Sequence, residues 1–137
     1  MANYQGTSRT NYFRVTDEAK YQELYNNLCA NDTIDDLTKE KDGTIYHGFG
    51  SYSGIDYKIN EDGSEMNFDK FLEELQKILP DDEAFVYFEA GHEKLKYITG
   101  YCIVVTNKTI INESITDWAE RTCKSLLGDN YNTEFNY

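Results

Sequence analysis

Residues 84–106 read AFVYFEAGHEKLKYITGYCIVVT and carry the clearest structural pattern in the chain. Residues 84–89 are apolar on both alternating faces, which predicts a strand in the centre of a sheet. Residues 91–94 predict a turn, and residues 95–106 form the longest run of strand-forming side chains. A further strand is expected at residues 109–111. This stretch therefore predicts strands that pair as antiparallel hairpins.

Three other segments place apolar residues at helical spacing. Residues 17–28 follow Thr16, a suitable N-cap, and residues 67–79 are stopped by Pro80. The third predicted helix begins at Ser114 and ends at Gly128. The apolar stripe expected to face inward on the third helix consists of Ile115, Trp118, Ala119, Thr122 and Leu126.

Shorter strands are predicted at residues 12–15, 44–49 and 55–59, because apolar and polar side chains alternate there. Residues 41–43 predict the turn that leads into the second of these strands. Residues 31–37 read as a weak strand or a loop.

The predicted order is β-α-β-β-α-β-β-β-α, which is typical of an α+β fold with an antiparallel sheet and helices packed on one face. The first six elements match the ferredoxin-like order β-α-β-β-α-β, extended by a C-terminal hairpin and helix. We expect a single domain over residues 1–137, with loose arms at residues 1–11 and 129–137.

Composition shows that this is a folding chain with an uneven charge distribution. Among its 137 residues are 12 Tyr, 7 Phe and one Trp, enough aromatic surface to build a core. The net charge is −12, from 25 acidic and 13 basic residues. Residues 31–83 carry 15 acidic and five basic side chains, so this segment alone has a net charge of −10. Direct binding to nucleic acid is disfavoured by that balance.

The sequence predicts a cytoplasmic protein. Its first residues contain no basic segment followed by an apolar run, and its longest apolar stretch is too short to span a bilayer. The three cysteines are widely spaced and form no C-x-x-C pair, as expected of a reducing compartment.

Motifs for catalysis or metal binding are missing. His92-Glu93 begins an H-E-x-x-H pattern, but Lys96 stands where the second histidine belongs, and His47 is the other histidine of the chain. The sequence has no calcium loop, G-x-S-x-G, P-loop or dinucleotide fingerprint. We therefore predict a non-catalytic protein without metal or cofactor.

The remaining signal is a combination of carboxylates and tyrosines, which suits an interface with a basic protein partner. Carboxylates at spacings like those of phosphates could occupy a groove that binds nucleic acid. The predicted partner-binding residues are Asp32, Asp35, Asp36, Glu40, Asp42, Tyr46, Tyr52, Tyr57, Glu61, Asp62, Glu65, Asp69, Glu73 and Glu74.

The runs Asn11-Tyr12-Phe13-Arg14-Val15 and Gly100-Tyr101-Cys102-Ile103-Val104-Val105 are similar to segments of small ferredoxin-like proteins carried by plasmids and conjugative elements. The size, the acidity and the missing catalytic motifs resemble the antirestriction and anti-CRISPR proteins of phages and mobile elements. That resemblance implies an inhibitor that mimics DNA or covers the DNA-binding surface of a defence nuclease. These inhibitors share no common motif, so the resemblance transfers no residue roles.

The leading hypothesis is an inhibitor whose acidic segment docks on the basic surface of a host defence protein, such as a CRISPR nuclease. One alternative is a binding domain or sponge for a signalling nucleotide, with residues 48–54, Tyr46, Tyr52 and Arg14 around a pocket. The other is an enzyme that uses His47 or His92 with a neighbouring carboxylate.

Overall fold

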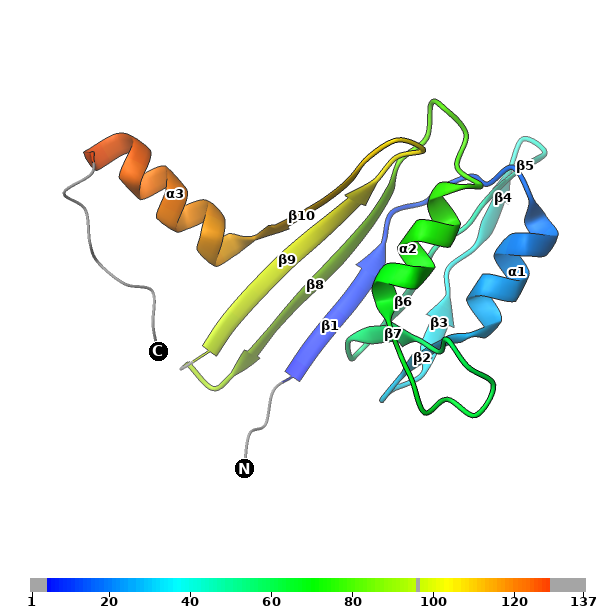
Figure 1. Cartoon of the computed structure of the whole chain (residues 1–137), viewed down its shortest axis with the longest axis horizontal. Coiled ribbons are helices and arrows are strands. Elements are labelled where there is room, and N and C mark those ends of the chain that lie inside the picture. The colour runs from blue at the N-terminus through cyan, green and yellow to red at the C-terminus, as the bar shows by residue number, and fades with distance from the viewer. Residues whose placement is uncertain (1–4, 96, 129–137) are drawn as a thin grey trace.

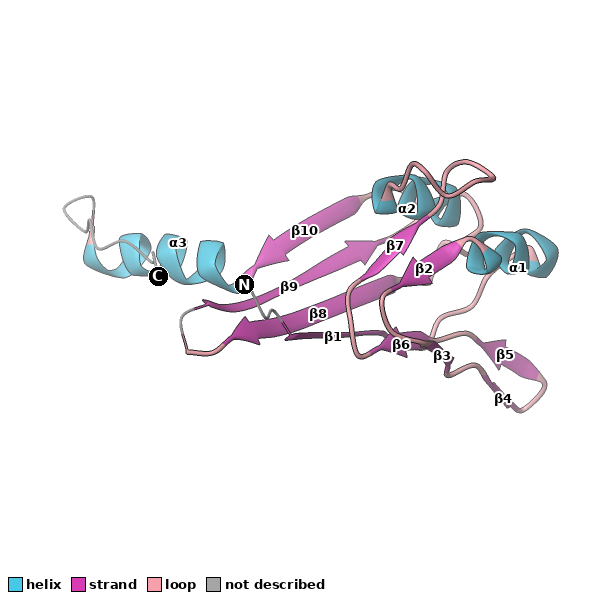
Figure 2. Cartoon of the chain, turned by 90° about the horizontal axis from the view of Figure 1, so that it is seen from below, coloured by secondary structure: helices cyan, strands magenta, loops and turns pink. Residues whose placement is uncertain are grey.

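The computed structural model describes residues 5–95 and 97–128, and it confirms the predicted α+β fold with an antiparallel sheet. Its six-stranded sheet has the order β10-β9-β8-β1-β6-β3, and each neighbouring pair is antiparallel. The strands are β1 (Gln5–Thr10), β3 (Ile34–Asp36), β6 (Phe49–Ser51), β8 (Phe85–Glu93), β9 (Tyr97–Val105) and β10 (Ile110–Ser114). Helices α1 (Glu18–Asn26) and α2 (Phe68–Gln76) lie on one face of this sheet (Figures 1 and 2).

Two short ribbons complete the strand content of the described residues. Strand β2 (Leu28–Ala30) pairs with β7 (Ile55–Tyr57), and β4 (Lys39–Lys41) pairs with β5 (Thr44–Tyr46). The β4–β5 turn has positive φ at both central residues, 53° at Asp42 and 79° at Gly43, as a type I′ hairpin requires. The turn predicted at residues 41–43 is therefore confirmed.

The β8–β9 hairpin is the longest pairing in the sheet, and it runs from Phe85 opposite Val105 to Glu93 opposite Tyr97. Strand β8 has β9 on one side and β1 on the other, which confirms its predicted central position. The hairpin extends further than predicted. Its turn lies at Lys94, where φ is 54°, and the predicted turn residues 91–93 belong to β8.

The prediction of a loose arm at residues 1–11 is wrong for the described part of that segment. Residues 5–10 form β1, which pairs with β8 on one side and β6 on the other. The inward side chains of β1 include Ser8 and Thr10. Because both are polar, the sequence lacks the apolar alternation that usually indicates a buried strand. Their hydroxyls find partners: Ser8 Oγ donates to the Ser53 carbonyl at 2.7 Å, and Phe49 N donates to Thr10 Oγ1 at 3.1 Å. The predicted arm at residues 129–137 lies outside the described residues.

The predicted strand at residues 12–15 is reduced to one antiparallel bridge between Phe13 and His47. Backbone hydrogen bonds of 2.9 and 2.8 Å join these two residues, and the Phe13 side chain is fully buried. The cap of α1 also differs from the prediction, because Asp17 Oδ1 accepts from Lys20 N while Thr16 Oγ1 donates to the Ile78 carbonyl. Helix α2 begins after Asn67, as predicted.

Helix α3 (Ile115–Leu127) has the predicted ends, since Ser114 Oγ accepts from Asp117 N at 3.1 Å and Gly128 follows its last turn. The prediction that its apolar stripe faces inward is wrong: the helix has no buried residue, and Trp118 is 56% exposed. The physical reason is its position. The helix continues directly from β10 and projects beyond the edge of the sheet, away from α1 and α2 (Figure 1).

Four strands and two helices, β1, α1, β3, β6, α2 and β8, follow the chain order β-α-β-β-α-β, and the β9–β10 hairpin and α3 extend them. The narrower assignment to the ferredoxin-like fold remains a prediction. The core lies between the sheet and α2, where the rings of Phe13, Phe49, Phe71 and Phe85 meet.

Two glycine substitutions test how tightly β1 and β6 are paired. A Cβ at Gly50 would lie 2.8 Å from the Ser8 carbonyl oxygen, so Gly50→Ala must push the strands apart. We expect the free energy of unfolding, measured with urea, to fall by about 1–3 kcal/mol. In the control, Gly100→Ala, the nearest atoms belong to Ile115 at an ordinary 3.5 Å, and we expect a change within about 1 kcal/mol. Equal losses in both variants would contradict this account of β1.

Candidate acidic binding surface

The predicted acidic residues come from two places in the fold. Five stand on or beside the edge strand β3 and the separate β4–β5 ribbon, and we name them the edge group: Asp32, Asp35, Asp36, Glu40 and Asp42. Five stand on the loop before α2 and on α2 itself, and we name them the loop–helix group: Glu61, Asp62, Glu65, Asp69 and Glu73. The sheet edge and α2 belong to different layers of the molecule (Figure 2).

In the edge group, β3 carries its two aspartates on opposite faces of the sheet, because Asp35 is opposite Gly50 and Asp36 is opposite Phe49. Asp36 accepts a hydrogen bond from Thr38 N at 2.9 Å, which orients its carboxylate. On the helix side, burial together with the nearby charge of Asp36 raises the pKa of Tyr25. The edge group therefore presents negative charge on both faces of the outermost strand.

The loop–helix group is supported by an ordered turn around Asn60. Its Oδ1 accepts from Glu65 N at 3.1 Å, and its Nδ2 donates to Ser64 Oγ at 2.8 Å. Ser64 N in turn donates to Asp62 Oδ1 at 2.9 Å, and this hydrogen bond lowers the pKa of Asp62 below its ordinary value. The loop thus holds an ionised carboxylate in a defined position.

The ten carboxylates of the two groups are all exposed, and none of them takes part in an ion pair within residues 5–95 and 97–128. Several cations of the described residues bind other carboxylates. Arg14 binds Asp82 and Glu83, and Arg121 binds Glu113. Ten exposed carboxylates therefore have no ion-pair partner among the described residues, although Lys39 and Lys41 flank Glu40 and Lys58 lies beside the loop at Gly63.

Two predicted surface residues do not belong to this surface. Tyr57 is only 8% exposed and packs in the core, with its ring centroid 5.6 Å from that of Phe71. Glu74 is mostly buried and is bound by both Lys77 and Lys70, whose hydrogen bonds lower the pKa of its carboxyl. Both corrections have the same cause, because side-chain direction and ion pairing depend on neighbours that are not adjacent in sequence.

The other two predicted tyrosines remain at the surface. Tyr46 is half-buried on β5. Tyr52 is 75% exposed and shares a hollow of about 460 Å³ with Asp32. The structure therefore brings one tyrosine directly beside the edge group, as a protein-binding surface needs.

The residues expected around a signalling nucleotide are spread over several elements. Residues 48–54 include strand β6 (Phe49–Ser51), and Gly50 lies against the backbone of β1, not in an open loop. Arg14 is bound by Glu83 at 2.8 Å and Asp82 at 3.0 Å, while Tyr52 lies in the hollow with Asp32 and Gln5. The residues of this set therefore lie in different parts of the fold, and the nucleotide-binding alternative stays a prediction.

The two histidines also lie apart. His47 is buried, its Nε2 is 2.6 Å from Glu18 Oε2, and its ring packs against that of Tyr21 in a tilted arrangement with centroids 4.1 Å apart. His92 is exposed near the far end of β8. Among the described residues, no group of three or more His, Cys, Asp or Glu side chains is arranged to hold a metal ion. The Glu18 carboxylate contacts His47 at the edge of the core, where only 8% of the imidazole side chain is exposed.

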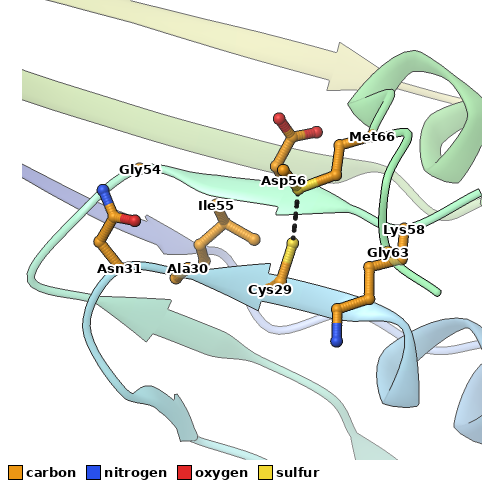
Figure 3. Close-up of a pocket in the computed structure, with 9 residues that line it drawn as sticks. All are labelled: Cys29, Ala30, Asn31, Gly54, Ile55, Asp56, Lys58, Gly63 and Met66. Atoms are coloured by element: carbon orange, nitrogen blue, oxygen red, sulfur yellow. Dashed lines mark hydrogen bonds between the residues drawn. The ribbon is translucent and has the colours of Figure 1, made fainter.

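One hollow that the sequence did not indicate lies beside the β2–β7 ribbon (Figure 3). It has a volume of about 500 Å³, and Cys29 Sγ lies 3.2 Å from Met66 Sδ at its wall. Burial and the charge of Asp56 raise the pKa of the Cys29 thiol, so this cysteine stays protonated at neutral pH and is a poor nucleophile. Its lining comes from three separate segments of the chain, so no local motif marks it.

Comparison of this chain with protein families, with curated protein sequences and with solved structures finds no match. Within the described part of the chain, no helix combines the length and the apolar composition needed to cross a membrane.

Neighbouring glutamates on α2 test whether the surface carboxylates are free. Glu74→Gln removes an acceptor from two lysines, and we expect the free energy of unfolding at pH 7 to fall by about 0.3–1 kcal/mol. Glu73→Gln removes an unpaired charge from a strongly acidic molecule, and we expect no loss or a small gain. Urea titrations of both variants and the wild type measure the difference.

The pH dependence gives a second check. The pKa of Glu74 is lowered in the folded state, so its contribution is present above the unfolded-state pKa and is lost as pH falls through the folded-state pKa. The stability difference between wild type and Glu74→Gln should therefore shrink below about pH 4. A loss in Glu73→Gln as large as that in Glu74→Gln would show that the surface charge is compensated.

Proposed function

We propose that this protein is a non-catalytic binding protein whose acidic surface docks on the basic, nucleic-acid-binding surface of another protein. The observation that carries the proposal is the set of ten exposed carboxylates without an ion-pair partner among the described residues. Unpaired surface charge repels itself and lowers stability, so a protein that keeps it gains when a partner of opposite charge neutralises it.

The rigidity of the elements under these charges supports the same function. The edge group stands on β3 and on a type I′ hairpin, and the loop–helix group stands on a hydrogen-bonded turn and on α2. Carboxylates held in place before binding lose little conformational freedom on association. Tyr46 and Tyr52 add aromatic contact area beside the edge group.

The target class that fits this surface is a nuclease of host defence, such as a CRISPR nuclease, whose nucleic-acid groove is lined with Lys and Arg. Carboxylates that replace phosphates in such a groove would exclude DNA or RNA and inhibit the enzyme. This is also the function implied by the resemblance to antirestriction and anti-CRISPR proteins. Such a target places the protein in the cytoplasm of the host cell.

Competition with DNA tests the proposal directly. Guide-loaded CRISPR nucleases from several types would each be mixed with a fluorescent target duplex, and displacement of the duplex would be followed by anisotropy. We expect the wild-type protein to displace DNA from at least one of them at about 50 mM salt, with affinity falling about tenfold or more by about 300 mM.

Charge-reversal variants locate the interface. Asp35→Lys/Asp36→Lys tests the edge group, Glu61→Lys/Asp62→Lys tests the loop–helix group, and we expect a loss of about tenfold or more from each reversal that lies in the interface. The control Glu23→Lys/Glu93→Lys changes the net charge equally outside both groups and should compete like the wild type. Failure to displace DNA from any nuclease tested, or competition that is indifferent to salt and to both reversals, would refute the proposal.

A further inference from the structure

The face of the sheet opposite α1 and α2 is apolar over β8, β9 and β10. Alternation along these strands places the side chains of Val86, Phe88, Ala90, Ile98, Cys102, Val104 and Ile111 on it, and we name them the outer apolar face. The polar residues His92 and Glu113 border it, and Glu113 is paired with Arg121 of α3 at 2.7 Å. Phe88, Ile98 and Ile111 are 49%, 47% and 54% exposed. Among the described residues, the first turn of α3 covers one end of this face, and no other helix packs over it (Figure 2). An exposed group of large apolar side chains of this kind marks an interaction site.

Helix α3 also exposes large apolar side chains. Its side chains Ile115, Trp118, Leu126 and Leu127 are between 51% and 78% exposed, although the first, second and third of them share one apolar stripe. Polar and charged side chains cover its other side. A helix of this amphipathic kind is stable when its stripe packs against an apolar surface.

Within one chain, helix and face meet only at the first turn of α3. Ile115 contacts the position of Gly100 at 3.5 Å, and an almost wholly apolar hollow of about 360 Å³ opens between Trp118 and the outer apolar face beside it. Beyond that turn the helix leaves the sheet edge, because it follows β10 without a loop (Figure 1). Leu126 therefore lies on the part of α3 that extends away from its own sheet.

Strand β10 is an edge strand of the sheet. It is the last strand of the sheet, and among the described residues only β9 pairs with it, so one side of its backbone has unpaired donors and acceptors. Its residues Ile110 and Ile111 are exposed, and no proline interrupts the strand. Open, apolar edge strands add a further strand readily.

Charge distinguishes this region from the rest of the molecule. Residues 97–128 carry three acidic and three basic side chains, whereas the whole chain has a net charge of −12. A second copy can approach through this neutral region while the acidic surfaces of both copies stay at a distance. A basic partner would gain no attraction from a neutral surface, so charge favours a second copy over the partner of the acidic surface.

We propose that the protein forms a two-fold symmetric dimer in which β10 of each copy meets the other at the sheet edge and α3 of each copy covers the other's outer apolar face. Such a dimer would bury the stripe of α3 and the outer apolar face, which a single chain leaves exposed. Because the contact is two-fold symmetric, each residue takes part once in each copy. The dimer does not depend on the proposed inhibitor function, since it uses none of the edge-group or loop–helix-group residues.

The mass in solution and the emission of Trp118 test the dimer together. Light scattering after gel filtration should give twice the 15.9 kDa of one chain. Trp118 is the only tryptophan, so its emission should be blue-shifted in the dimer and should move to the red on dilution. Because the contact is apolar and neutral, added salt should not weaken it, unlike binding at the acidic surface.

Leu126→Lys and Ile111→Lys should each weaken the association by at least about tenfold, because each places a charge in an apolar contact. Both side chains are exposed in the single chain, so circular dichroism should show a normal fold. The control Ile59→Lys adds the same charge at a residue that is 43% exposed outside the contact, and it should remain dimeric.

A chain shortened to residues 1–128 should keep both the dimer mass and the blue-shifted emission. A monomer mass at every concentration would overturn the proposal, as would dimers that survive both Leu126→Lys and Ile111→Lys. A monomer whose Trp118 emission shifts to the red when residues 129–137 are removed would instead show that the chain covers its own helix.

Discussion

The ring of Phe85 contacts three other phenylalanine rings, with centroid separations of 5.0 Å to Phe13, 6.2 Å to Phe49 and 6.0 Å to Phe71. These four rings come from β8, the segment after β1, β6 and α2, so one cluster joins the centre of the sheet to its helical layer. Aromatic contacts of this geometry add to the stability gained from burial alone. Both acidic groups depend on the cluster, because β3 pairs with β6 and the loop–helix group stands on α2.

The carboxylates of the described residues fall into two sets, those in ion pairs and those without an ion-pair partner. Arg14, Lys70 and Lys77 bind carboxylates that are partly buried, where an unpaired charge would be costly. The edge group and the loop–helix group lie in water, where each carboxylate remains solvated and the cost of leaving it unpaired is small. Stability is thus maintained by the core and by a few paired cations, and the exposed carboxylates add no ion pair to it.

The two proposed surfaces have opposite chemistry and lie at different places on the sheet. One is acidic and follows β3 and α2, and the other is apolar and neutral and follows β10 and α3. A dimer joined through β10 would carry two acidic surfaces, one at each end of the extended sheet. If a target exposed two basic sites at a matching distance, both surfaces could bind at once, and the overall affinity would exceed that of one site without any new contact.

Much of the fold was determined by the sequence itself, because local patterns are strong where the chain alternates or repeats with helical spacing. The β8–β9 hairpin, the turn at Asp42-Gly43, the start of α2 and both ends of α3 follow from such patterns. The excess of acid in residues 31–83 was also plain from the sequence. Only the tertiary structure decided that residues 5–10 enter the middle of the sheet, that Tyr57 turns inward and that Glu74 is neutralised by two lysines. It also decided that, among the described residues, most of the apolar stripe of α3 stays exposed. Each of these outcomes depends on contacts between residues far apart in sequence, and neither periodicity nor composition encodes which distant segments will meet.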